Sequence, residues 1–325
     1  MNNSMKKKNI FLLLTALICT VLWGCDDKQN ISESITAAAT EREIDSYTQI
    51  ELPGEAVISN ESIEEDSIKS KADADIETSI AAQEESLKTT DCNLNGVDFR
   101  MILVEGGTFT MGSNARAEGN GTQVGNQAGE HQVSLSSFLV GETEVTRALW
   151  DEVMNGIHND DDLNYPIASV TVPECQSFVE KLNEKAHAAN IIPANQNFHM
   201  LTEAQWEYAA KGGNKSKGYT YAGSDSLSEV GWTSSDGGSV HAVKLKKPNE
   251  LGLYDMSGNV YEWVSDYAAP YSTEPQTDPC NTVPSDNYVK RGGSFYYNDD
   301  YRFTSTYRYF YSATDYTIGF RIGLS

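Results

Sequence analysis

Apolar and polar residues follow the spacing of folded elements from about residue 99 onward. Residues 99–104 and 108–111 are apolar-rich runs on either side of Glu105-Gly106-Gly107, and this pattern predicts two strands joined by a tight turn. A further strand is expected over residues 131–140. Order is therefore predicted to begin near Phe99 and to continue to the end of the chain.

Three helices are predicted, because capping residues stand directly before apolar residues at helical spacing. Thr146 precedes residues 147–154, and the capping boxes Thr171-Val-Pro-Glu174 and Thr202-Glu-Ala-Gln205 open the other two helices. Cys175 falls within the apolar stripe of the second helix, which favours packing over a redox role. The predicted strands and helices together indicate a mixed α and β fold.

Residues 26–90 lack such periodicity and are rich in Ser, Glu, Asp, Ala and Thr. A segment of this composition buries too little apolar surface to offset chain entropy. We therefore expect residues 25–98 to form an acidic, disordered tether that holds the domain of residues 99–325 away from a membrane.

The first residues are typical of a secretory signal peptide. Lys6-Lys7-Lys8 precede a short apolar run, and Leu22-Trp23-Gly24-Cys25 resembles a bacterial lipobox. By that resemblance residues 1–24 are removed and Cys25 carries a lipid anchor, although an ordinary cleaved signal remains an alternative. The expected location is the bacterial cell envelope, outside the cytoplasm, with the outer membrane or the cell surface favoured.

The net charge of −23 argues against nucleic-acid binding, because an acidic surface repels phosphate backbones. Beyond the signal and Cys25 only Cys92, Cys175 and Cys280 remain, so at most one disulfide can form. The histidines are scattered without ligand spacing, which gives a zinc site little support. We expect the protein to be a monomer.

Residues 295–316, called the cassette below, have an unusual composition. Its 22 residues are drawn from eight types, ten of them are aromatic, and seven of the 17 tyrosines of the chain lie here. Tyr provides large, rigid contact area, while Ser, Asn, Asp and Thr provide adaptable hydrogen bonds, as in antibody loops. The cassette is therefore either a contact surface or a Tyr-rich strand and loop packed within a polar fold.

Several longer motifs give the ordered part a specific resemblance. In chain order they are Phe109-Thr-Met-Gly112, Glu144-Val-Thr146, Leu201-Thr-Glu-Ala-Gln-Trp-Glu-Tyr-Ala-Ala210, Gly252-Leu-Tyr-Asp-Met-Ser-Gly-Asn-Val-Tyr-Glu-Trp263, Arg291-Gly-Gly-Ser294 and Gly319-Phe-Arg321. This series resembles the formylglycine-generating enzyme family, also called sulfatase-modifying factors. The resemblance implies an α+β, C-type-lectin-like fold with small antiparallel sheets, two to three helices and much loop.

Formylglycine-generating members carry two cysteines shortly after the Gly-Gly-Ser motif, and their thiolates bind copper. The matching positions here are Tyr297 and Arg302, which cannot ligate Cu(I). We therefore expect no copper and no catalysis of this type.

The resemblance also implies a calcium loop. Its ligands would be Asp255, the carbonyl groups of Gly258 and Val260, and Glu262, and hard oxygen ligands of this kind suit Ca²⁺. The alternative is that Asp255 and Glu262 only stabilise turns.

The cassette itself resembles that of a branch of variable proteins diversified by retroelements, in which template adenines are replaced during reverse transcription. Changes in the first two letters of AAC codons cannot yield Lys, Glu, Gln, Met or Trp, and none of these occurs among the 22 residues. The candidate ligand contacts are Tyr296, Tyr297, Asp299, Asp300, Tyr301, Arg302, Tyr307, Arg308, Tyr309 and Tyr311.

The sequence thus predicts a lipid-anchored, non-enzymatic protein that binds a protein or glycan through the cassette. One alternative is a structural lipoprotein of a secretion or motility assembly. Another is an oxidase of the formylglycine-generating type, which the absent cysteine pair disfavours.

Overall fold

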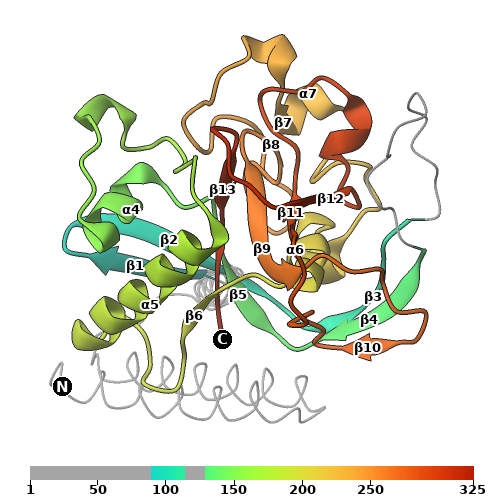
Figure 1. Ribbon diagram of the computed structural model, residues 1–325, viewed down its shortest axis with the longest axis horizontal. Helices are drawn as coiled ribbons and strands as arrows, with labels where there is room; N and C mark the ends of the chain where they lie inside the picture. The colour runs from blue at the N-terminus through green and yellow to red at the C-terminus, as the bar shows by residue number, and fades with distance from the viewer. Residues whose placement is uncertain (1–88, 114–128) are drawn as a thin grey trace, which may run out of the picture. The chain divides into compact units, whose positions relative to one another are not determined.

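The computed structural model describes residues 89–113 and 129–325, so the predicted signal peptide, Cys25 and nearly all of the tether lie outside the described residues. The described chain forms four small sheets and a few helices (Figure 1). This arrangement confirms the predicted α+β fold class.

The largest sheet has the strand order β1-β2-β5-β14-β6 and joins the start of the domain to its end. Its strands are β1 (Thr89–Leu94), β2 (Val97–Val104), β5 (Phe138–Gly141), β14 (Ile322–Leu324) and β6 (Phe198–Met200). Strands β1 and β2 form a hairpin through Asn95 and Gly96, which both have positive φ. The prediction that the tether extends to residue 98 is therefore wrong: Asn-Gly is a strong hairpin signal, and it lies between two strands here.

Two strands replace the single one predicted over residues 131–140. Strand β4 (His131–Leu135) lies in a three-stranded sheet between β10 (Gln276–Thr277) and β3 (Gly107–Met111), whereas β5 pairs with β2 and β14. Ser136 and Ser137 separate β4 from β5, and the Ser136 backbone N–H donates to Asp278. The chain therefore passes from one sheet to another within residues 131–140, where the pattern of apolar and polar residues predicted one continuous strand.

The sheet that positions the cassette has the order β12-β11-β9-β13. Its strands are β12 (Arg308–Tyr311), β11 (Tyr288–Arg291), β9 (Tyr261–Tyr267) and β13 (Ile318–Phe320). A two-stranded sheet pairs β7 (Gly231–Trp232) with β8 (Ser257–Gly258). Most strand pairs are antiparallel, as expected, while β13 runs parallel to β9, β7 to β8 and β10 to β4.

The three predicted helices are present with their predicted caps. They are α4 (Arg147–Met154), α5 (Val172–Ala188) and α6 (Glu203–Ala210), capped by Thr146, Thr171 and Thr202, and a short α7 (Leu227–Val230) follows. Single 3-10 turns are η1 (Asp160–Asp162), η2 (Gly213–Lys215), η3 (Ser234–Asp236) and η4 (Asp300–Phe303). Among the helices of the described ranges, none is long and apolar enough to cross a membrane.

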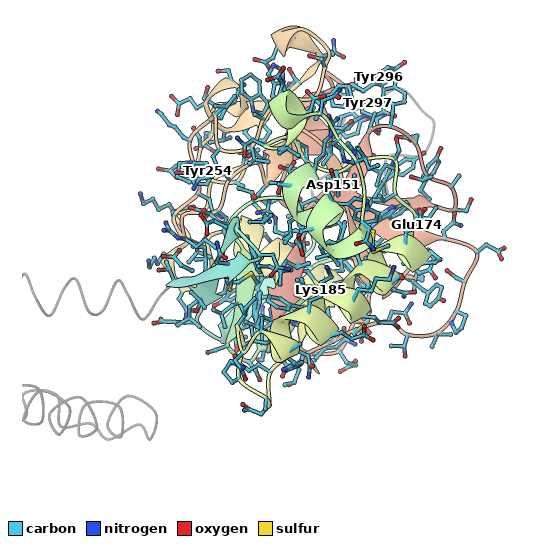
Figure 2. All side chains as sticks on the ribbon, turned by 90° about the vertical axis from the view of Figure 1, so that its left-hand side faces the viewer. Asp151, Glu174, Lys185, Tyr254, Tyr296 and Tyr297 are labelled. Carbon is cyan, nitrogen blue, oxygen red and sulfur yellow. The ribbon has the colours of Figure 1, made fainter. Side chains whose placement is uncertain are left out.

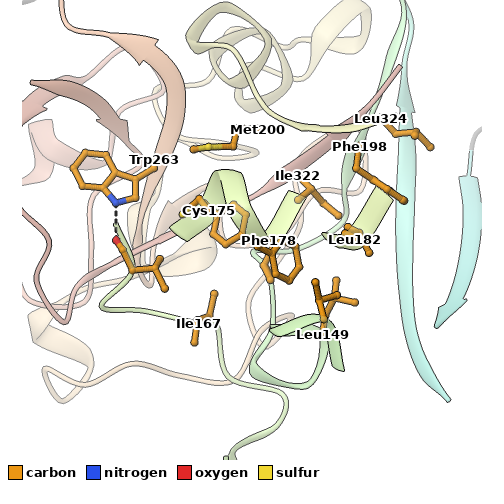
Figure 3. Close-up of a cluster of buried hydrophobic side chains, with 14 of the residues drawn as sticks. Leu149, Ile167, Cys175, Phe178, Leu182, Phe198, Met200, Trp263, Ile322 and Leu324 are labelled. Carbon is orange, nitrogen blue, oxygen red and sulfur yellow. Dashed lines mark hydrogen bonds between the residues drawn. The ribbon is translucent and has the colours of Figure 1, made fainter. Parts of the chain in front are cut away.

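One hydrophobic cluster forms around α5 (Figure 3). The Phe178 ring stacks on Trp150 at 5.4 Å and meets Phe320 of β13 edge-on at 5.3 Å. Trp263 of β9 donates its indole N–H to the Val170 carbonyl at 2.9 Å. Cys175 is completely buried in this cluster, which confirms its packing role. The β12-β11-β9-β13 sheet thus rests on the core through β9 and β13.

Candidate functional site

The chain turns sharply as it leaves β11 and enters the cassette. Gly292 and Gly293 have φ values of +91° and +79°, in the left-handed region that favours glycine. A Cβ atom on Gly293 would lie 2.6 Å from the Phe303 ring, closer than van der Waals contact permits. Gly293 therefore lets Phe303 of η4, which is fully buried, pack directly against the turn.

Strand β12 divides the cassette between two faces of the sheet, because successive side chains of a strand point in opposite directions. Arg308 and Phe310 face α6 and the cluster around it. Tyr309 and Tyr311 lie on the other face and pack against the cluster around α5. Within one strand the cassette thus supplies both anchoring residues and residues of the opposite surface.

The anchoring face is held by buried ion pairs with α6. Arg308 forms a two-point pair with Glu203: its Nε atom lies 2.7 Å from Oε1, and Nη2 contacts Oε2. Arg291 pairs with Glu207 at 2.5 Å. Burial raises the pKa of the Glu207 carboxyl, but Arg291 and Lys211 outweigh it and hold the pKa below its ordinary value. The carboxylates of α6 therefore fix β11 and β12 in place.

Two of the predicted contact residues are buried, Arg308 beside α6 and Tyr307 in the cluster around α5. Arg308 is 2% exposed and its guanidinium also donates to the Ala269 carbonyl, while Tyr307 is 1% exposed. The expectation that these two side chains contact a ligand directly is therefore corrected. Each guanidinium nitrogen of Arg308 has a hydrogen-bond partner within the fold. The Tyr307 ring contacts those of Tyr301 and Tyr309.

The remaining candidates form a connected aromatic layer, called the tyrosine surface below. It consists of Tyr296, Tyr297, Asp299, Tyr301, Arg302, Tyr309 and Tyr311, together with Tyr316, which the predicted set did not include. Asp300 is the exposed first residue of η4. Tyr296 and Tyr316 are 55% and 57% exposed, and their rings lie 5.9 Å apart. Figure 2 shows Tyr296 and Tyr297 side by side at one edge of the molecule. The structure therefore brings most of the candidates together.

Two cations are set among these rings. The Arg302 guanidinium lies 4.4 Å from the Tyr297 ring centre, pairs with Asp299 at 2.9 Å and donates to the Tyr307 hydroxyl. Lys290 of β11 lies beneath Tyr309 and Tyr311 and is 3% exposed. Sequence reasoning did not single out Lys290, because only strand pairing reveals that it shares a face with Tyr309.

The positions that match the cysteine pair of formylglycine-generating members, Tyr297 and Arg302, are in contact here. The three described cysteines are free thiols. Cys92 and Cys175 are buried in the α5 cluster, and burial raises the pKa of both thiols. Cys280 lies beside Ser265, with its sulfur 3.5 Å from the hydroxyl oxygen.

The predicted calcium ligands Asp255 and Glu262 are both buried. One carboxylate oxygen of Asp255 accepts the Lys244 backbone N–H, and the other has no partner among the described atoms, as an ion-binding oxygen would. Glu262 is engaged, since its carboxylate pairs with Arg321 at 2.9 Å and accepts the Trp206 indole N–H. Across the described ranges no three His, Cys, Asp or Glu side chains form a metal-binding group. The free carboxylate oxygen of Asp255 thus fits an ion ligand. Glu262 would have to leave its ion pair with Arg321 to bind the same ion. Calcium binding stays a prediction.

The fold and the motifs are matched by one family model, that of the sulfatase-modifying factor enzyme 1-like domain, over residues 95–324. The chain belongs to this family. The match covers the whole described domain except β1 and confirms the resemblance predicted from the motifs.

Two sequence relatives place the chain within the family. The chaperone protein LppX of Paenibacillus barcinonensis is 30% identical over 222 residues, which cover 53% of this chain and 74% of that protein. The formylglycine-generating enzyme of Streptomyces coelicolor is 39% identical over 119 residues, covering 31% of this chain and 37% of the enzyme. The chain thus matches just over a third of the length of that enzyme.

Solved structures share the architecture. Treponema denticola variable protein 1 superimposes with a TM-score of 0.61 at 28% identity, covering 72% of this chain and 98% of that protein. PvdO from Pseudomonas aeruginosa gives a TM-score of 0.56 at 23% identity, covering 70% of this chain and 94% of that protein, and supports the fold alone.

Proposed function

We propose that this chain is a non-enzymatic binding protein that contacts a protein or glycan through the tyrosine surface. The observation that carries this proposal is the division of the cassette into two parts. Arg308 and Phe303 are buried anchors, whereas Tyr296 and Tyr316 are large, exposed side chains. A rigid base lowers the entropy cost of binding, so the anchored cassette is suited to recognition.

The similarity to Treponema denticola variable protein 1 supports a further element of the proposal. The cassette would be diversified at its exposed positions by a retroelement. A near-copy of the 3′ end of the gene, with adenines at these positions and a reverse transcriptase gene nearby, is the expected finding. If the cassette is invariant among sister strains and no such copy exists, this element of the proposal is wrong.

The protein would act outside the cytoplasm, attached through a lipid on Cys25. This position lies outside the described residues, and support comes from the lipobox-like sequence alone. Replacement of Cys25 by Ser should abolish labelling by radioactive palmitate and release the chain from the membrane fraction. Retained labelling would exclude Cys25 as the lipidated residue.

A binding screen with the full chain tests the proposed surface. Wild type and the triple variant Tyr296→Ala, Tyr297→Ala, Tyr316→Ala would be compared on glycan and surface-protein arrays. Tyr219→Ala is the matched control, because it removes a tyrosine outside the cassette that lies 5.9 Å from Lys217. We expect the triple variant to lose binding by at least about tenfold, as for buried aromatic hot spots. Equal loss in the control would contradict the assignment.

The enzyme alternative has its own assay. Oxygen consumption with copper and a Cys-containing sulfatase peptide should stay at the background rate, because Tyr297 and Arg302 stand where the cysteine pair is expected. Turnover of the peptide would overturn the proposal.

A further inference from the structure

Lys290 is the buried cation of the tyrosine surface, and its neighbours are aromatic rings. Its ammonium lies 4.2 Å from the Tyr261 ring centre, 4.3 Å from Tyr311 and 5.3 Å from Tyr309. The Lys290 side chain is 3% exposed. Its nitrogen does not belong to the group of fully buried side-chain atoms without a hydrogen-bond partner. Rings of Tyr261, Tyr309 and Tyr311 therefore surround the ammonium of Lys290.

Other lysines that lie over rings in this chain have an oxygen partner as well. Lys211 lies over Phe109 and pairs with Glu207 at 2.7 Å, and Lys246 lies over Trp232 and pairs with Asp236 at 3.1 Å. Lys290 differs from them: within residues 89–113 and 129–325, its ammonium has no hydrogen-bond or ion-pair partner. A ring contact with a desolvated cation contributes about 2 kcal/mol or more. Burying an ammonium without a carboxylate partner costs several kcal/mol.

The ionised form of Lys290 is consequently disfavoured. Burial lowers the pKa of its amine to about 8, and Arg302 adds to this effect while Asp315 opposes it. The groups that face the amine are Tyr261 from β9, Tyr309 and Tyr311 from β12, Arg302 from η4, and Asp315 from the loop before β13. None of them gives the ammonium the close carboxylate that would stabilise it.

We propose that Lys290, with Arg302 nearby, is the binding point for a carboxylate group of the ligand, while the surrounding tyrosine rings contact the part of the ligand that carries it. The proposal rests on the proposed binding function and names the chemistry of its ligand. A singly charged group is favoured over phosphate, because Asp299 and Asp315 lie close by and repel a second negative charge.

Equilibrium dialysis of the full chain with radiolabelled benzoate tests this site without the natural ligand. Benzoate combines a carboxylate with a ring that can stack on tyrosine, and benzamide is its neutral match. We expect benzoate to bind at least tenfold more tightly than benzamide. Its affinity should also fall about tenfold per pH unit above the amine pKa, because one proton is coupled to binding.

Variants locate the effect. Lys290→Met should abolish the preference for benzoate, Lys290→Arg should retain it, and Lys217→Met is the control lysine over a tyrosine ring. Retention of charge in Lys290→Arg keeps the test valid if the Met variant folds poorly. Equal binding of benzoate and benzamide, or an unchanged preference in a folded Lys290→Met variant, would overturn the proposal.

The two proposals fail separately. If benzoate shows no preference but the triple tyrosine variant loses array binding, the surface binds a ligand without a carboxylate at Lys290. If benzoate binds at Lys290 and the arrays show no tyrosine-dependent ligand, the carboxylate site stands and the proposed recognition function falls.

Discussion

Arg308 and Glu203 form a buried two-point ion pair between the cassette and the first residue of α6. Arg308 is part of the cassette, but its side chain is buried inside the domain. The pair ties β12 to the helix beneath it and leaves the next residue, Tyr309, on the opposite face. The position of β12 and of the tyrosine surface therefore depends on a buried contact with α6.

Removal of Arg308 should destabilise the protein far more than removal of an exposed tyrosine. Arg308→Ala leaves Glu203 buried with a reduced set of partners, so we expect a loss of about 3 kcal/mol in the free energy of unfolding. Tyr296→Ala should change it by less than about 0.5 kcal/mol, since the ring is half exposed. Urea unfolding followed by circular dichroism measures both, and equal losses would contradict the anchoring role of Arg308.

Replacement of Gly293 by Ala should disturb the entry to the cassette. Its positive φ strains any side chain, and the added Cβ would also collide with Phe303. Gly237→Ala is the matched control, because Gly237 has a φ of +104° with nothing within 4 Å of the added atom. We expect Gly293→Ala to cost about 1–3 kcal/mol more than the control, the usual cost of overpacking. Thermal unfolding compares them, and equal melting temperatures would show that Phe303 moves aside freely.

Patterns among neighbouring residues predicted the helices and the family correctly, but they predicted the strands less well. Capping residues such as Thr171 act within one turn of the chain, so their effect can be read from neighbouring residues. Strand pairing depends on distant segments, which is why residues 131–140 looked continuous although β4 and β5 belong to different sheets. The missed hairpin at Asn95-Gly96 did have a local signal, which the acidic composition around it obscured.

The location of the candidate site could be predicted from the sequence. Which of its side chains are buried and which are exposed could not. Composition marked residues 295–316, yet it could not show that Tyr307 is buried and Tyr316 is exposed. Those facts follow from the pairing of β12 with β11 and from partners on α6, more than 80 residues away in the chain. For the same reason Lys290 carried no signal, because its aromatic neighbours come from two other strands.

Calcium binding at Asp255 is tested by chelation. An ion that binds only the folded chain stabilises it by mass action, so EGTA should lower the melting temperature of the wild type and added calcium should restore it. Asp255→Asn should melt lower than wild type and should not respond to EGTA. Asp236→Asn is a control with a carboxylate paired to Lys246. A wild-type melting temperature that EGTA leaves unchanged would exclude the predicted ligands.

The buried amine of Lys290 should make stability rise with pH in the alkaline range. Its pKa is about 8 in the folded chain and near its ordinary value of 10.5 in the unfolded chain. Below pH 8 both states carry the proton, and the cost of burying the ammonium is fully present. Between these values the unfolded state binds a proton that the folded state has lost, so the free energy of unfolding increases with pH.

Comparison with Lys290→Met isolates this contribution from the titration of the tyrosines. From pH 7.5 to 10.5 the wild type should gain stability relative to the variant, by up to about 3 kcal/mol from the size of the pKa change. Lys217→Met should show no such difference, because its amine lies at the surface. Urea unfolding at several pH values in the absence of carboxylate ligands is the measurement. Parallel curves for wild type and Lys290→Met would mean that the amine is stabilised in the fold by a partner other than the rings around it.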